Sequence, residues 1–338
     1  MSSKNKIVIL GGGFASVAAA RVISKDKNVD LCLVAPEGEF VFVPILHEIA
    51  TGGLSAEIAR IRISSILPVG ARILDAYATS IDTVSKKTSL SDGLELSYDA
   101  LIIATGGRVE HPEGFVGLRS VKDALFILDK ISKIKMSHQE SVITIVGGGP
   151  TGVELVLEMA QFLAGSKVKI NLVHSGERIL KNFPEEIARN AMSALSKAGI
   201  GVILNKKIIS KNNDDLVLSD NSIMHGGFCI WTAGLSIPVL GGLEYSSAGL
   251  VVNEDLRVSG AKGIFGAGDV VSLLNDWNKT AQCAVQMGEV AGLNALSFLK
   301  GRKLKKFIFK KRGELISLGR FRASGVVFGV HISGFFVW

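Results

Sequence analysis

Two glutamines lie four residues apart in a stretch that is otherwise small and apolar. The stretch is residues 279–288, KTAQCAVQMG, and the glutamines are Gln282 and Gln286. Positions four apart share one face of a helix. A buried amide needs hydrogen-bond partners, so such a pair serves either a structural network or a site for a polar molecule. The rest of the sequence is needed to choose between a structural network and a binding site.

A glycine turn follows the first apolar run of the chain. Residues 6–10, KIVIL, predict a strand, and residues 17–24, VAAARVIS, predict a helix. Between them, Gly11, Gly13 and Ser16 have the spacing G-x-G-x-x-S. In a dinucleotide-binding turn, these positions permit the tight turn, the approach of a pyrophosphate and close packing of helix on strand. The N terminus of the helix, at Phe14 and Ala15, would then face the phosphates.

An acid that binds a ribose is expected about 20 residues past such glycines. The following strand, VDLCLVA, ends at Ala35, where that acid usually stands. The nearest acid is Glu37, which we take as the candidate.

The same unit recurs in residues 141–163, SVITIVGGGPTGVELVLEMAQFL. Gly147, Gly149 and Gly152 give an unbroken G-x-G-x-x-G, and Pro150 and Thr151 open the helix. One such turn could be an ordinary feature of an α/β domain. Two in one chain indicate two dinucleotide sites, one for a flavin nucleotide and one for a nicotinamide nucleotide.

Two further strand ends support this interpretation. Residues 98–107, YDALIIATGG, end a buried strand at Ala104, Thr105 and Gly106. Residues 263–271, GIFGAGDVV, place Gly268 and Asp269 after another strand. An aspartate there can accept hydrogen bonds from ribitol hydroxyls, and it can also cap a helix.

Composition narrows the class of protein. The chain has 338 residues, of which 47% are hydrophobic and 20% charged, so it predicts two or three well-packed domains. Cys32, Cys229 and Cys283 lie far apart, which argues against a disulfide framework, a zinc site or a local redox disulfide. We expect no metal. Without a membrane-spanning run or a cleavable leader, the reducing cytoplasm is the expected compartment.

The positive charge is concentrated near the C terminus. The whole chain carries a net charge of +7, and residues 300–312, KGRKLKKFIFKKR, hold eight lysines and arginines and no acid. A solvated loop explains such a segment, as does a surface for anionic lipid. Nucleic acid is a weaker alternative. The apolar end, ASGVVFGVHISGFFVW, finishes in aromatic residues and favours lipid.

The order GGGFAS, ATGG, GGGPTGVE and GAGD resembles the two-dinucleotide-domain flavoproteins, the pyridine nucleotide reductases. KTAQCAVQMGEVAG, followed by FKKRGELISLGR and SGFFVW, is similar to type II NADH dehydrogenases, which are single-chain NAD(P)H:quinone oxidoreductases. The resemblance covers essentially the whole chain. It implies bound FAD, NADH or NADPH as the reductant, and a quinone as the acceptor.

The resemblance also implies roles for individual residues. Gln282 and Gln286 would face the flavin ring and the quinone head group, with Ala281 leaving room for a flat ring. Ala233 and Gly234 would contact the nicotinamide nucleotide. Glu154, expected in the first turn of the second glycine-turn helix, would lie near the nicotinamide–flavin stack and affect hydride transfer or proton supply. Otherwise it is a surface acid favoured by the helix dipole.

The nicotinamide domain departs from the usual pattern at one position. An acid that binds the 2′-hydroxyl of NADH normally ends its second strand. Here His174 and Ser175 stand there, with Arg178 close by. These side chains would not repel a 2′-phosphate, so NADPH use or weak discrimination is open.

The sequence thus predicts an α/β fold of two Rossmann-like dinucleotide-binding domains, one inserted in the other. An FAD domain would span 1–112 and 235–306, an NAD(P)H domain 113–234, and a C-terminal membrane-associating, quinone-side module 307–338. We expect a peripheral protein on the inner face of the cell membrane, bound to anionic lipid through the basic segment. We expect no nucleic acid partner. A homodimer is compatible with the resemblance.

Other functions fit the same fold. A sulfide:quinone oxidoreductase needs cysteines beside the flavin, and Cys283 has no evident partner. A disulfide or ferredoxin reductase is a further alternative, which the absent dithiol and the basic, apolar tail disfavour. A third alternative is a flavoprotein resembling apoptosis-inducing factor, in which nicotinamide binding switches an interaction.

Overall fold

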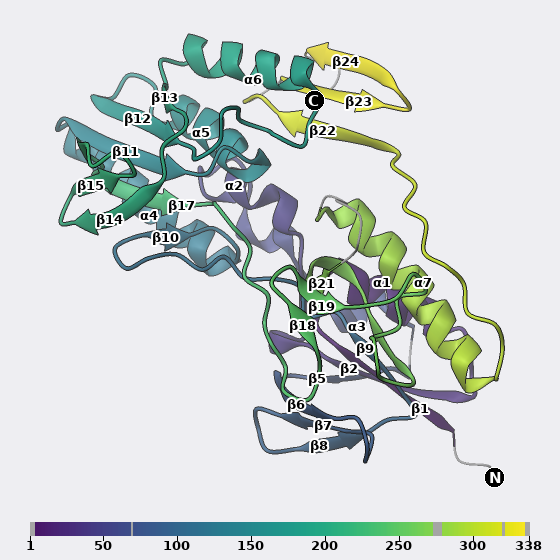
Figure 1. Cartoon of the computed structure of the whole chain (residues 1–338). Coiled ribbons are helices and arrows are strands. Elements are labelled where there is room, and N and C mark those ends of the chain that lie inside the picture. Colours follow the sequence, from purple (N-terminus) through teal and green to yellow (C-terminus); the bar gives the residue numbers. More distant parts are fainter. Residues whose placement is uncertain (1–3, 69, 273–278, 320–321, 335–338) are drawn as a thin grey trace. The chain divides into compact units, whose positions relative to one another are not determined.

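The computed structural model describes residues 4–68, 70–272, 279–319 and 322–334. The chain folds into two compact units, each assembled from three separate stretches of sequence (Figure 1). The first unit comprises Met1–Val41, Arg60–Arg108 and Ser236–Lys311. The second comprises Phe42–Ala59, Val109–Leu235 and Arg312–Trp338. Both have a mixed α/β fold around a parallel sheet, as the sequence predicted.

The compact units divide the chain differently from the predicted domains, which stay a prediction, and the largest differences lie in two segments. Residues 42–59, which the sequence assigned to the first domain, group with the second unit because α2 (Leu46–Ile49) packs on helices of that unit. Residues 312–338, expected to be part of a separate module, also group with the second unit. In that segment β22 (Gly313–Ser317) contacts α5 (Pro150–Phe162).

The first unit is built on five parallel strands in the order β20-β9-β1-β2-β5. Four of these strands are wholly or mostly buried and apolar, as expected for a parallel sheet whose faces are covered. The strand order reverses at β1, because β2 lies on one side of it and β9 on the other. Open α/β sheets bind ligands at such a reversal. The strands are β1 (Asn5–Leu10), β2 (Val29–Val34), β5 (Arg72–Leu74), β9 (Ala100–Ile103) and β20 (Ile264–Gly266).

Helices α1 (Phe14–Ile23) and α7 (Ala281–Leu299) pack against each other beside this sheet (Figure 1). Small residues allow their backbones to come close. A Cβ on Gly288 would lie 2.1 Å from the carbonyl oxygen of Ala15, and one on Gly292 would lie 3.0 Å from that of Ala19. The alanines and glycines of KTAQCAVQMGEVAG therefore set the distance between the helix and the first glycine turn.

The remaining elements of the first unit are short. They comprise β3 (Glu39–Val41) paired with β4 (Arg60–Arg62), the helix α3 (Ile63–Ile66), the antiparallel sheet of β6 (Ala78–Asp82), β7 (Lys87–Leu90) and β8 (Glu95–Ser97), and the sheet of β18 (Tyr245–Ser246), β19 (Gly249–Val251) and β21 (Val271–Ser272).

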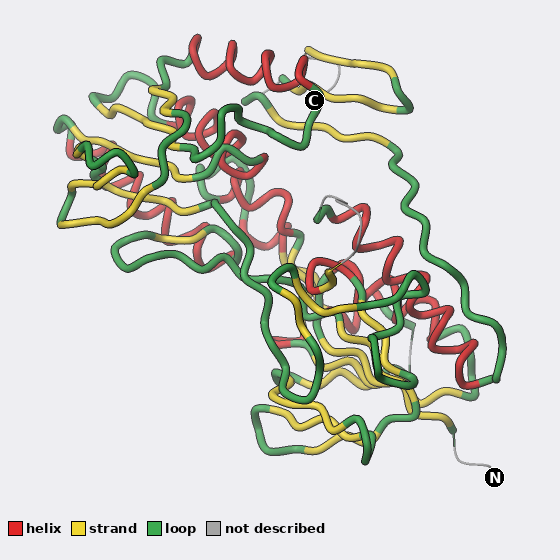
Figure 2. The backbone as a smooth tube through the Cα atoms, in the orientation of Figure 1, coloured by secondary structure: helices red, strands yellow, loops and turns green. Residues whose placement is uncertain are grey.

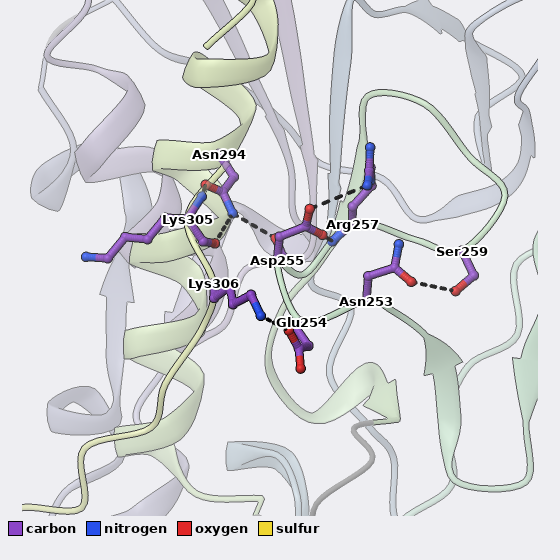
Figure 3. A network of polar contacts seen from close by, with 8 residues as sticks. All are labelled: Asn253, Glu254, Asp255, Arg257, Ser259, Asn294, Lys305 and Lys306. Carbon is purple, nitrogen blue, oxygen red and sulfur yellow. Dashed lines mark hydrogen bonds and ion pairs between the residues drawn. The ribbon is translucent and has the colours of Figure 1, made fainter. Parts of the chain in front are cut away.

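Residues 302–312 follow α7 with neither helix nor strand, and they form the long loop before β22 in Figure 2. Two amides of α7 hold this segment. Asn294 Nδ2 donates to the carbonyl oxygen of Lys305 at 2.9 Å, and its Oδ1 accepts from the Lys305 N–H at 2.8 Å (Figure 3). The same Nδ2 donates to the carbonyl of Asp255 at 2.7 Å. We call residues 302–311 the basic strap.

The second unit repeats the architecture with five parallel strands in the order β10-β17-β11-β12-β13. The strand order reverses at the central strand β11 as well: β12, which follows it in the chain, lies on one side, and β17 lies on the other. The strands are β10 (Val116–Gly117), β11 (Ser141–Val146), β12 (Val168–Val173), β13 (Gly201–Ile203) and β17 (Phe228–Trp231).

Three long helices accompany this sheet: α4 (Val121–Ser137), α5 and α6 (Glu185–Lys197). A capping box starts α4, since Ser120 Oγ accepts from the Asp123 N–H at 3.1 Å while Asp123 Oδ2 accepts from the Ser120 N–H at 2.8 Å. Two antiparallel sheets complete the unit: β14 (Ile208–Asn212), β15 (Asp215–Leu218) and β16 (Ile223–His225), and β22 with β23 (Ala323–Val327) and β24 (Val330–Gly334).

None of the helices in the described residues is long and apolar enough to cross a bilayer. The aromatic end of the chain, residues 335–338, on which part of the membrane prediction rested, lies outside the described residues.

Candidate functional site

The first glycine turn touches the end of β9. Gly11 has φ +119°, and a Cβ there would lie 2.2 Å from the carbonyl oxygen of Ala104, so only glycine fits. Ser16 Oγ donates to the same carbonyl at 3.3 Å. The β1–α1 turn and the ATGG segment, predicted from separate motifs, therefore form one cradle at the carboxyl edge of the sheet.

This cradle has the features that a dinucleotide needs. A Cβ on Gly13 or Gly106 would meet no atom within 4 Å, so the backbone there is open to a ligand. Thr105 Oγ1 is buried and has no hydrogen-bond partner within the described structure. Because buried hydroxyls are normally paired, this orphaned group fits a bound flavin nucleotide with polar atoms at that point.

A second wall of the cradle comes from the end of β20. Gly268 has φ +80°, and a Cβ on it would lie 3.1 Å from the Ala15 Cβ and 3.7 Å from that of Ala284. Asp269 follows directly in a short 3₁₀ helix that contacts α7. The structure thus brings GAGD, the first glycine turn and the glutamine helix together.

The ribose acid remains a prediction, and the structure adds a candidate. Glu37 is exposed, has φ 59°, and its N–H donates to Asp75 Oδ1 at 2.6 Å. Glu39, two residues on, lies beside the turn, because a Cβ on Gly12 would lie 3.0 Å from its main-chain carbonyl oxygen. Glu39 Oε2 is buried without a hydrogen bond, 3.6 Å from Arg60 Nε. The second acid of PEGEF was the sequence signal for it, and our sequence analysis missed it.

The glutamine pair occupies the start of α7. Ala281 and Gln282 lie in the first turn, after the Thr280 side chain, which accepts from the Cys283 N–H at 3.2 Å. Gln286 pairs with the main chain of Lys310: Nε2 donates to its carbonyl and Oε1 accepts from its N–H, both at 2.9 Å. Gln286 thus has a structural role in holding the basic strap. The flavin and quinone roles of both glutamines stay predictions.

The second glycine turn repeats the close packing of the first. Gly147 has φ +121°, and a Cβ on Gly152 would lie 1.9 Å from the Gly147 carbonyl oxygen. A Cβ on Gly149 would meet nothing within 4 Å. Pro150 and Thr151 begin α5, whose first N–H groups lack intrahelical acceptors and suit an anion.

The end of β17 lies beside this turn. Thr232 Oγ1 donates to the carbonyl of Val146 at 3.0 Å and so ties the two strand ends together. Ala233 follows, held by the Trp231 indole, whose Nε1 donates to its carbonyl at 2.7 Å. Gly234 has φ +74° and open space at its Cβ position. These residues frame a second cradle that fits a nicotinamide nucleotide.

Glu154 lies deeper than the sequence suggested. It is the fifth residue of α5, so it begins the second helical turn rather than lying in the first. Its side chain is only 17% exposed, and its Oε1 accepts from the Ser317 N–H at 3.1 Å. Burial raises the pKa of Glu154 to about 8; the hydrogen bond from Ser317 opposes this, and the charges of Glu48 and Glu158 add to it. The carboxyl is therefore largely protonated at pH 7.

His47, on α2, faces Glu154 and was missed by the sequence analysis. Its Nδ1 lies 3.8 Å from Glu154 Oε2, while its Nε2 is buried without a hydrogen-bond partner in the described residues. Burial lowers the pKa of His47 to about 4, so the imidazole is neutral. The proton of this pair therefore resides on Glu154, which can act as a proton donor. The signal for it was the pair His47-Glu48 in PILHEIATGG, which our motif search did not use.

The three cysteines are buried and free. Burial raises the pKa of Cys283 and of Cys229 to about 11, which disfavours their thiolates. Neither thiol therefore has the low pKa typical of a reactive cysteine.

The chain matches known proteins over most of its length. The family model for pyridine nucleotide-disulphide oxidoreductases matches residues 5–288. The chain is 28% identical to demethylphylloquinone reductase NdbB of Synechocystis over 98% of its own length and 89% of the relative's. It is 26% identical to the type II NADH:quinone oxidoreductase of Staphylococcus aureus, over 98% and 92% of the two chains.

Among solved structures, NDH2 of Plasmodium falciparum in complex with NADH superposes with a TM-score of 0.85 at 21% identity. That alignment covers 98% of this chain and 92% of the other. At this identity, the likeness shows the fold.

Proposed function

Because the chain belongs to the pyridine nucleotide-disulphide oxidoreductase family, we propose that it oxidises NADH and reduces a quinone through bound FAD. The observation that carries the proposal is the pair of glycine cradles, each at the carboxyl edge of its own parallel sheet, where the strand order reverses. The relatives named above reduce quinones by their printed names, and the chain covers about nine-tenths of each.

Each cradle has a separate task. The first would hold FAD through the turn at Gly11–Gly13, Thr105 and Asp269, and the second would hold NADH at Gly147–Gly149 and Gly234. Bound flavin supplies the redox chemistry, since it accepts a hydride and passes two electrons on. The protein supplies orientation and protons. Glu154, protonated at neutral pH and facing the neutral His47, is the group we assign to proton supply.

Anaerobic flavin bleaching tests this function. NADH should bleach the flavin absorbance of the FAD-loaded protein, and a water-soluble quinone should restore it. A Gly149→Val variant should fold normally, because its Cβ enters open space, yet lose bleaching by NADH. Bleaching by sulfide but not by NADH would reject the proposal in favour of a sulfide:quinone oxidoreductase. Flavin that NADH reduces but quinone cannot reoxidise would reject the quinone step.

We also propose that the basic strap binds an anionic membrane surface, which would place the enzyme peripherally on the inner face of the membrane. Among the described residues, the ammonium groups of Lys303, Lys305 and Lys310 have no acidic partner. Ile308 lies between them with 72% of its surface exposed. Asn294 and Gln286 fix the backbone at Lys305 and Lys310 through hydrogen bonds, so the segment that carries these charges is anchored to α7. Such a basic and apolar strip suits anionic lipid.

Vesicle sedimentation tests the strap. The protein should sediment with vesicles that contain anionic lipid and much less with zwitterionic ones, and the binding should fall with salt. A triple change of Lys303, Lys305 and Lys310 to Gln should weaken binding strongly. The matched control changes the exposed Lys167, Lys169 and Lys197 of the second unit to Gln and should change binding little. Equal losses in both variants would mean that net charge, rather than the strap, governs binding. The homodimer stays an expectation of the family resemblance.

A further inference from the structure

His174 occupies the position directly after β12, where a dinucleotide-binding domain usually places its ribose-binding acid. Its ring lies against the glycine turn: Nδ1 accepts from the Gly148 N–H at 3.2 Å. Two glycines enclose it, since a Cβ on Gly148 would lie 2.8 Å from its Cγ and a Cβ on Gly176 would lie 2.9 Å from its Nε2. The imidazole is therefore part of the wall of the second cradle.

The main chain at His174 is fixed as well. Its N–H donates to the carbonyl of Ile203 at 2.8 Å, and its carbonyl accepts from the Lys206 N–H at 3.1 Å. Because β12 and the residues after β13 continue to pair beyond the strand ends, the position of the ring relative to the glycine turn is well defined.

The ring is neutral. Burial lowers the pKa of His174, although a contact with the backbone of Arg178 opposes this, and Nδ1 must be unprotonated to accept from Gly148. The guanidinium of Arg178 is committed inside its own loop, with Nη1 donating to the carbonyl of Phe183 at 3.2 Å and Nη2 to that of Lys181 at 2.6 Å. The contacts of His174 and Arg178 in the described structure thus lie within the loop and the glycine turn, and their contact with a nicotinamide nucleotide stays a prediction.

The other charged residues beside the His174 ring do not favour either NADH or NADPH. Glu177 is the only acid in residues 174–178, and it is exposed and adjacent in sequence to the positive Arg178. Lys206 forms an ion pair with Asp220, and Lys207 is exposed. The strand end therefore offers no buried carboxylate that would repel a 2′-phosphate. Of its cations, Arg178 and Lys206 are engaged by other groups, and Lys207 lies in solvent.

We propose that the nicotinamide site accepts dinucleotides with and without a 2′-phosphate, and that His174 is the residue that sets this dual specificity. The inference rests on the proposed function, because it takes the second cradle as the nicotinamide site. A carboxylate at 174 would accept a hydrogen bond from the ribose 2′-hydroxyl and repel a phosphate. The neutral imidazole instead accepts a hydrogen bond from the glycine turn. It would place no charge beside the 2′-group of the nucleotide's ribose.

Equilibrium titration with NAD⁺ and NADP⁺ tests this without turnover. The FAD-loaded protein is titrated by calorimetry, since the oxidised nucleotides differ only at the 2′-phosphate and do not reduce the flavin. The two dissociation constants of the wild type should agree within about tenfold. His174→Glu keeps an acceptor for the Gly148 N–H and adds a negative charge, so its NADP⁺ affinity should fall about tenfold or more while NAD⁺ binding persists.

Two further variants separate charge from structure. His174→Gln is neutral and retains an acceptor, so it should keep the wild-type ratio of affinities. Glu177→Gln removes the nearby acid and should also leave the ratio unchanged. A wild type that binds NADP⁺ more than about a hundredfold more weakly than NAD⁺ would overturn the inference, as would a ratio that responds to Glu177 instead of His174. If neither nucleotide binds, the proposed function itself is wrong.

Discussion

Replacing Glu154 with glutamine should make the free energy of unfolding fall less as the pH rises from about 5.5 to 8.5. The pKa of this carboxyl rises from 4.5 to about 8 in the folded chain, mainly through burial. A carboxyl with a raised pKa binds its proton more tightly when folded than when unfolded. Its contribution therefore makes the protein most stable at low pH and is lost as the pH rises from the unfolded pKa to the folded one.

The size of the effect follows from the two pKa values. Between pH 5.5 and 8.5, linkage predicts that Glu154 lowers the free energy of unfolding by about 3 kcal/mol. Glutamine has the shape of the protonated acid and can still accept from the Ser317 N–H, so Glu154→Gln should lack this loss. The lowered pKa of His47 acts in the opposite direction below its ordinary value of 6.5, but both proteins share it, so it cancels in the difference.

Urea unfolding at several pH values, with FAD in excess, measures this difference. Over the same interval, the wild type should lose at least 1 kcal/mol more than Glu154→Gln, because relaxation around a buried acid reduces the ideal figure. Glu185→Gln, which removes an exposed acid on α6, should behave as the wild type does. Parallel curves for the wild type and Glu154→Gln would refute the buried, protonated state of Glu154.

The two ends of the first glycine turn should respond differently to the same substitution. Gly13→Ala places its methyl group in open space, so the unfolding temperature should stay the same while the affinity for FAD falls. In Gly11→Ala the methyl group would collide with the backbone of Ala104, so this variant should not fold normally. Equal thermal stability of the two variants would contradict the geometry. Asn294→Asp keeps the acceptor for the Lys305 N–H but loses the donor to two carbonyls, which should cost about 1–3 kcal/mol in urea unfolding and expose the basic strap to proteolysis. An unchanged digestion pattern would mean that this amide does not hold the strap.

Much of the fold was predictable because its signals are local. Each glycine turn is a strand, a tight turn and a helix within about 25 residues, and the constraints on Gly11 and Gly152 are steric ones that any sequence must satisfy at those positions. Parallel strands whose faces are both covered also read as apolar runs, which identified β1, β2, β9 and β11.

The site was harder to predict where long-range packing decides the role of a residue. Gln286 reads equally well as a quinone ligand and as a structural amide, and only the course of residues 302–312 shows that it pairs with Lys310. From the sequence, His174 is only a residue that would not repel a 2′-phosphate, and the fold shows that its Nδ1 accepts from the N–H of Gly148. In both cases, the partner is a backbone group that no side-chain motif records.

Sequence alone determined that this chain has two dinucleotide-type turns and a basic segment near its C terminus, since glycine spacing and charge are properties of adjacent residues. Only the tertiary structure decided how Glu154 is protonated. Its environment comes from α2, α5 and β22, three elements separated by about a hundred residues or more along the chain. A pKa depends on burial and on neighbouring charges in space, and folding alone brings His47, Glu154 and Ser317 together.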